Sequence, residues 1–174
     1  MITAAMDLVR LGHTNALPFT LLRDAAAAYI DNTSWATKPI NWFETALVEI
    51  SEQCKGTRGP VTPVDDRPMN TRTAGRRRHR GEAPGEQWYQ LADYLDQYGR
   101  RERAEHTPPV WFWEAAADHA DPDSQDALGD NAWARGLYRD GAQLWKSARA
   151  VGKPAPNTNA ERWQQLLDGP FGEQ

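Results

Sequence analysis

A run of arginines is the first feature of this 174-residue sequence whose chemistry suggests a ligand. Guanidinium groups contact phosphates, and each phosphate that they neutralise adds salt-dependent affinity independent of base sequence. The run holds no aromatic residue that could stack on a base, which favours a solvated linker. A nucleic-acid site here is therefore the alternative reading. Its candidate contacts are Arg72, Arg76, Arg77, Arg78 and Arg80.

Other reactive side chains are sparse. His119, Asp121 and Asp123 lie close in sequence and have the donor atoms of a metal site. However, the two aspartates flank Pro122 at a predicted helix start, where carboxylates cap free N–H groups. Cys54 would be a nucleophile only if folding placed a histidine beside it. We expect no catalytic residue, no metal site and no cofactor, although an enzyme whose site is assembled only by folding is a third reading.

Tryptophan is used heavily, with eight residues, most of them at spacings typical of a helical core. Trp113 is an exception, because it follows Trp111 by two positions and points off the face that Trp111 would bury. We expect Trp113 to line a partner-binding surface together with Trp133, Tyr138 and Arg139. Replacement of Trp113 by alanine would then weaken binding and leave the melting temperature nearly unchanged.

Apolar residues recur at helical spacing on both sides of a Pro-, Gly- and Arg-rich segment. We expect an N-terminal helical bundle over residues 1–53, a linker over 54–86 and a helical hairpin domain over 87–174. No strand alternation is long enough for a sheet, although 61–64 could be one short extended piece. The predicted helices are 2–11, one that opens at Leu17-Pro18, 39–53, 87–98 with Gly99 as its stop, one that Thr107 caps with Pro108 first, a pair over 128–148, and one that Thr158 and Glu161 start.

The stretch from Leu128 to Ala148 has the small–large rhythm of a helix–turn–helix repeat of about 34 residues. Gly136 is expected to separate the two helices. Small residues let the helices approach closely, and large ones fill the space between them. The stretch resembles one tetratricopeptide repeat, with Gly141 where that family usually has alanine. The predicted fold class is all-α: stacked, tetratricopeptide-like hairpins with about eight helices and a concave surface suited to a protein or peptide.

A wider resemblance depends on three signatures. They are Ala4 to His13 followed by Leu17-Pro18, then Trp42 to Leu47 followed by Cys54 to Pro60, and finally Tyr89 to Arg101 followed by Pro108-Pro109, Trp113 and residues 135–139. Their combination is similar to the helical C-terminal region of large actinobacterial ATP-binding regulatory proteins. The resemblance implies a region that binds a partner while an ATPase acts as a nucleotide switch. Because this chain has no GxxxxGK[ST] loop, it does not itself contain that ATPase. Three readings stay open: a separate small protein with the ATPase as a partner, a truncated relative, or an excised fragment.

Composition places the chain outside several classes. The net charge is -4, so the molecule as a whole is not basic, and its single cysteine permits no internal disulfide. Mean hydropathy is -0.76, no apolar run approaches the roughly 20 residues of a membrane span, and the first residues lack a secretory signal. The sequence therefore predicts a non-catalytic helical protein–protein interaction module of a cytoplasmic regulatory or signalling assembly, without a membrane.

Overall fold

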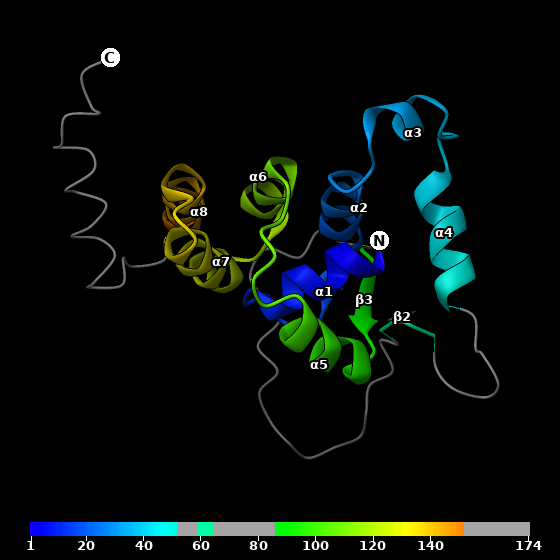
Figure 1. Ribbon diagram of the computed structural model, residues 1–174, viewed down its shortest axis with the longest axis horizontal. Helices are drawn as coiled ribbons and strands as arrows, with labels where there is room; N and C mark the ends of the chain where they lie inside the picture. Colours follow the sequence, from blue (N-terminus) through cyan, green and yellow to red (C-terminus); the bar gives the residue numbers. More distant parts are fainter. Residues whose placement is uncertain (52–58, 65–85, 152–174) are drawn as a thin grey trace, which may run out of the picture.

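The chain is mostly helical, as predicted, with a small sheet. The computed structural model describes residues 1–51, 59–64 and 86–151, and within these ranges it contains eight helices and three short strands (Figure 1). The predicted last helix, started by Thr158 and Glu161, lies outside the described residues. In chain order the elements are α1 (Ile2–Arg10), β1 (Leu17–Pro18), α2 (Phe19–Ala27), α3 (Asn32–Ala36), α4 (Trp42–Ser51), β2 (Val61–Pro63), β3 (Trp88–Leu91), α5 (Asp93–Glu102), α6 (Val110–His119), α7 (Pro122–Ala134) and α8 (Tyr138–Ala150).

The three strands form an antiparallel sheet in the order β1-β3-β2, which contradicts the prediction that no sheet is present. Leu17 pairs with Tyr89, and Val61 pairs with Leu91. The side chain of Asn15 extends the pairing, since its Oδ1 accepts from the Leu91 N–H at 2.8 Å and its Nδ2 donates to the Leu91 carbonyl at 2.9 Å. Strands this short show no detectable alternation in sequence. The extended piece expected at 61–64 is confirmed as β2.

The helix predicted over 87–98 was wrong at both ends, and strand β3 explains its late start. Trp88 to Leu91 is extended, so α5 begins only at Asp93, and it then continues past Gly99. Gly99 does not end α5 but lies in close contact with α1, because a Cβ on it would lie 3.1 Å from the Met6 Cβ. Its missing side chain allows α5 to cross α1 closely.

Proline placement accounts for two further shifts of helix start. Pro18 has extended dihedral angles in β1, so α2 begins after it, at Phe19. Thr107 does not cap α6. Pro108 stands before a second proline, Pro109, and a residue before proline is disfavoured in the helical region, so the helix cannot begin at Pro108. Pro109 becomes the N-cap, and α6 begins at Val110.

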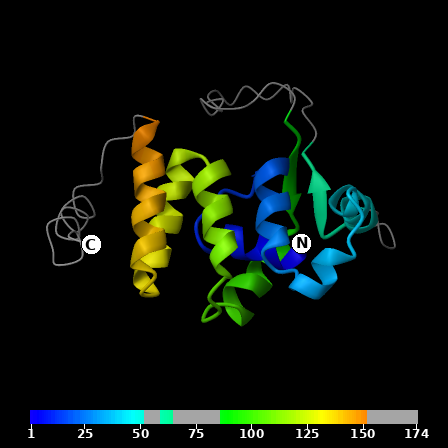
Figure 2. The ribbon, with the colours of Figure 1, turned by 90° about the horizontal axis from the view of Figure 1, so that it is seen from above.

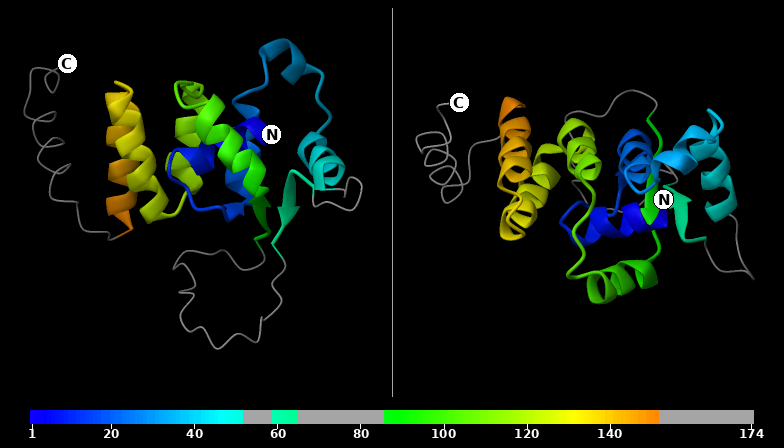
Figure 3. Two further views of the ribbon diagram at one scale, coloured as in Figure 1. Left: turned by 60° about the horizontal axis from the view of Figure 1, so that its bottom comes forward. Right: turned by 45° about the horizontal axis from the view of Figure 1, so that its top comes forward.

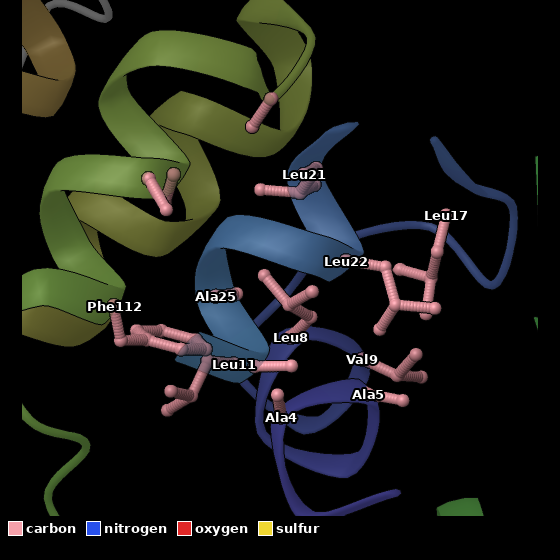
Figure 4. Close-up of a cluster of buried hydrophobic side chains, with 14 of the residues drawn as sticks. Ala4, Ala5, Leu8, Val9, Leu11, Leu17, Leu21, Leu22, Ala25 and Phe112 are labelled. Carbon is pink, nitrogen blue, oxygen red and sulfur yellow. The ribbon is translucent and has the colours of Figure 1, made fainter. Parts of the chain in front are cut away.

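The hydrophobic core draws on residues from both sides of the predicted linker. Helix α2 packs against α6, and α1 packs against α5. Figure 4 shows Phe112 of α6 reaching toward Ala25 of α2 and toward Leu11, the residue that follows α1, all of them buried. The segment boundaries at 53/54 and 86/87 stay a prediction, whereas the core itself is continuous across the two helical halves.

A buried ionic cluster joins α1 to the residues that follow α2 and α5. The Asp7 carboxylate is fully buried and accepts hydrogen bonds from Arg10 Nε at 2.7 Å, from Arg103 Nε and Nη2 at 2.8 Å each, and from the Tyr29 hydroxyl at 2.5 Å. Burial by itself raises the pKa of this carboxyl. The hydrogen bonds from Arg103, Arg10 and Tyr29 outweigh that effect, so the pKa of Asp7 lies below its ordinary value.

Candidate protein-interaction site

The α7–α8 hairpin lies at one end of the molecule and matches the predicted helix–turn–helix pair (Figures 1 and 2). Gly136 follows α7 with φ of 79°, a left-handed conformation that favours glycine and ends the helix there. The two helices bury the residues that the small–large rhythm predicts. These are Leu128, Gly129 and Ala132 of α7, and Gly141, Leu144, Trp145 and Ala148 of α8.

Two glycines bring the helices of this hairpin together. A Cβ on Gly129 would lie 2.5 Å from Trp145 Nε1, so the indole ring occupies the space where a side chain would stand. A Cβ on Gly141 would lie 3.0 Å from the Gly129 carbonyl oxygen. A side chain at position 141 would therefore require the α7 backbone to shift by a few tenths of an ångström.

Trp113, which was predicted to line the partner-binding surface, is buried, and that prediction was wrong. Its exposed fraction is 2%, whereas Trp111, which was predicted to be buried, is 67% exposed. Helix α6 packs between α2 and α8, so a large part of its circumference is buried. Phe112, Trp113 and Ala117 all lie in this buried part. The Trp113 ring packs edge-on against Phe112, with ring centroids 5.2 Å apart.

The other three predicted contact residues lie at or near the surface where α7 meets α8. Trp133 is half-buried, and its ring centroid lies 4.7 Å from that of Tyr138 and 5.3 Å from that of Trp145. Tyr138 is 52% exposed, and Arg139 is exposed. The structure thus brings Trp133 and Tyr138 together as an aromatic pair, with Arg139 beginning the outward face of α8.

The outward face of α8 carries a shallow hollow that the sequence reasoning missed. We call it the α8 outer stripe. It is lined by Arg139, Ala142, Gln143, Lys146, Ser147 and Ala150. The helices that pack on α8, namely α6 and α7, lie on its opposite side (Figure 2). A sequence signal did exist, because these are the helix positions left over once Gly141, Leu144, Trp145 and Ala148 face inward.

The remaining candidate groups take up polar contacts or lie outside the described residues. His119 Nε2 lies 2.8 Å from Asp24 Oδ2, which joins α6 to α2. Asp121 is the N-cap of α7, as predicted, and accepts hydrogen bonds from the backbone N–H groups of Asp123 and Ser124. Within 1–51, 59–64 and 86–151, no three His, Cys, Asp or Glu side chains are grouped to hold a metal ion.

The arginine candidates Arg72, Arg76, Arg77, Arg78 and Arg80 all lie outside the described residues, and so does Cys54. The nucleic-acid alternative therefore stays a prediction. No helix in the described part of the chain is both long enough and apolar enough to cross a membrane. Comparison of the chain with protein-family models, with curated proteins and with solved structures gave no match.

Proposed function

We propose that this chain is a non-catalytic helical module that binds an acidic segment of another protein chain through the α8 outer stripe. The observation that carries this proposal is the make-up of the stripe: a shallow hollow that combines the small side chains of Ala142, Ser147 and Ala150 with the exposed Gln143 and the exposed cations of Arg139 and Lys146. Small residues allow a helix to approach closely, and flanking cations favour a partner with carboxylates.

The spacing of the two cations suits a helical partner. Arg139 and Lys146 are seven residues apart, which is about 10 Å along the axis of α8. Carboxylates about two turns apart on an antiparallel helix would face them. Tyr138 lies one turn before Ala142 on the same side of α8 and is backed by Trp133, so it adds an amphipathic aromatic group of the kind enriched at protein interfaces.

The wider setting is also part of the proposal. The small–large rhythm of α7 and α8 supports a tetratricopeptide-like stack, in which a hairpin presents an outer helix to the next element. The three sequence signatures support a place in a cytoplasmic regulatory assembly, with a nucleotide-switch ATPase as a candidate partner.

Site-specific photocrosslinking tests this function. A photoreactive amino acid at Gln143, on the stripe, is compared with the same group at Gln97, an exposed glutamine of α5, in lysate of the native host. We expect adducts with an acidic protein segment from position 143 only, and their loss when Arg139 and Lys146 are both changed to glutamate. Equal adducts from both positions, or adducts indifferent to the charge reversal, would contradict the proposal.

A further inference from the structure

We propose that the segment joining α3 to α4 binds the interface of a lipid bilayer, into which the side chains of Trp35 and Ile40 insert. The binding surface, which we call the α3–α4 tip, consists of Trp35, Lys38, Pro39, Ile40 and Trp42. Helix α3 stands out from the body at the edge opposite α8, as Figures 1 and 3 show. The α3–α4 tip is therefore separate from the α8 outer stripe, and this inference does not depend on the proposed function.

The α3–α4 tip is exposed because this part of the chain contributes almost nothing to the core. Helix α3 has no buried residue, and every residue from 31 to 41 is exposed. The exposed fraction of Ile40 is 102%, and that of Trp35 is 49%. Large apolar side chains that gather on a surface mark a site of contact with a protein or a membrane.

Ring contacts connect the α3–α4 tip to the core. The Trp35 ring packs edge-on against Trp42, with centroids 6.0 Å apart, and Trp42 packs edge-on against the buried Phe43 at 5.4 Å. The Lys38 ammonium lies 5.7 Å from the centre of the Trp42 ring. Pro39 fixes its own φ. These contacts order the tip before it binds, which lowers the entropic cost of binding.

The side chains of the α3–α4 tip suit a lipid surface better than a pocket in another protein. Tryptophan combines an apolar ring with a polar N–H and is enriched at membrane–water interfaces. Lys38 makes no ion pair with the residues that the structure describes, and its flexible chain can reach lipid phosphates while its stem follows apolar groups. The fully exposed Ile40 makes the tip convex, and a fluid bilayer accepts a convex tip without a matching pocket.

The backbone of the α3–α4 tip is also prepared for an apolar environment. The N–H groups of Trp35, Lys38 and Trp42 donate to carbonyl oxygens three or four residues earlier, at 2.8, 3.1 and 3.1 Å. Pro39 has no N–H to satisfy. Paired backbone groups lose less free energy on leaving water than unpaired ones. Binding of this kind takes place in the plane of the interface and needs no membrane-spanning helix.

Co-flotation with vesicles of phosphatidylcholine and one fifth phosphatidylglycerol tests this inference in the full chain. Half of the wild type should float at about 0.1–1 mM lipid, which is as weak as a single acyl anchor or weaker. Ile40→Ser should need at least about fivefold more lipid, because complete removal of one isoleucine from water contributes roughly a factor of ten or more. Trp35→Ser should act in the same direction. Binding should persist in about 0.5 M salt, since insertion and not charge drives it.

Val151→Ser is the matched control, because Val151 is also an exposed aliphatic residue, 65% exposed, but follows α8 at the opposite edge. It should float like wild type, and Ile40→Ser should keep the wild-type melting temperature. Three results would overturn the inference: wild type that stays unbound at about 5 mM lipid, equal flotation of Ile40→Ser and Val151→Ser, or complete release in about 0.5 M salt. The two proposals fail separately, since R139E/K146E should lose the crosslinks from Gln143 and still float in the same salt.

Discussion

Removal of the Asp7 charge is the sharpest test of what holds this fold together. The Asp7 side chain is completely buried, and that of Arg10 is only 2% exposed. Asp7→Asn would leave the guanidinium groups of Arg10 and Arg103 in a buried site without their counter-charge. Breaking a buried ion pair from one side costs about 3–5 kcal/mol, compared with a total free energy of unfolding of about 5–15 kcal/mol for a typical domain.

Urea unfolding followed by tryptophan fluorescence measures this loss, and Asp96→Asn is the matched control. Asp96 also accepts from an arginine Nε at 2.7 Å, but its partner Arg100 is 56% exposed. An exposed pair of this kind contributes about 1 kcal/mol or less. Equal costs for Asp7→Asn and Asp96→Asn would refute the reasoning, because Asp7 is buried and also accepts hydrogen bonds from Arg103 and Tyr29, whereas Asp96 is paired with the exposed Arg100 alone.

The pH dependence of the same variant has a definite sign. Because the pKa of Asp7 is lower in the folded chain than its ordinary value of about 4, the ionised carboxylate stabilises the fold. That contribution is complete above the ordinary value and is lost as pH falls through the lowered one. The difference in unfolding free energy between wild type and Asp7→Asn should therefore hold constant from about pH 7 to 5 and shrink in stronger acid. A difference that grows in acid would contradict this sign.

Three further outcomes follow from packing. Trp113→Ala should lower the free energy of unfolding by about 3–5 kcal/mol because its ring is buried, whereas Trp111→Ala, with an exposed ring, should change it by about 0.5 kcal/mol or less. Thermal melting of the two variants should show a clearly lower melting temperature for Trp113→Ala only. Gly129→Ala should cost about 1–3 kcal/mol because its Cβ meets Trp145, and a change within 0.5 kcal/mol in denaturant titration would mean that the ring moves aside freely. Gly136 has φ of 79° but open space where a Cβ would stand. Gly136→Ala should therefore lower the free energy of unfolding by only about 1 kcal/mol in the same titration.

Trp133, Tyr138 and Arg139 were predicted as partner contacts, and that role stays a prediction. The ring contact of Trp133 with Tyr138 was not predicted, although the two residues lie near each other in the sequence on either side of one turn. The α8 outer stripe escaped prediction, because Ala142, Lys146 and their neighbours look like any solvated helix face. What distinguishes them is that the helix lies at the edge of the molecule, and no local pattern carries that information.

Elements whose contacts are local can be predicted from the sequence. The helix pair α7–α8 can be read from its small–large rhythm and from Gly136, because helical periodicity brings residues three and four apart onto one face. Tertiary structure alone decided the rest. Strand β1 exists only because Leu17 meets Tyr89, and α5 is fastened by Arg103 reaching Asp7, 96 residues away. Trp113 is buried because α2 and α8 both cover α6. Such contacts join segments distant in the chain, and periodicity within one segment cannot specify which distant segment it will meet.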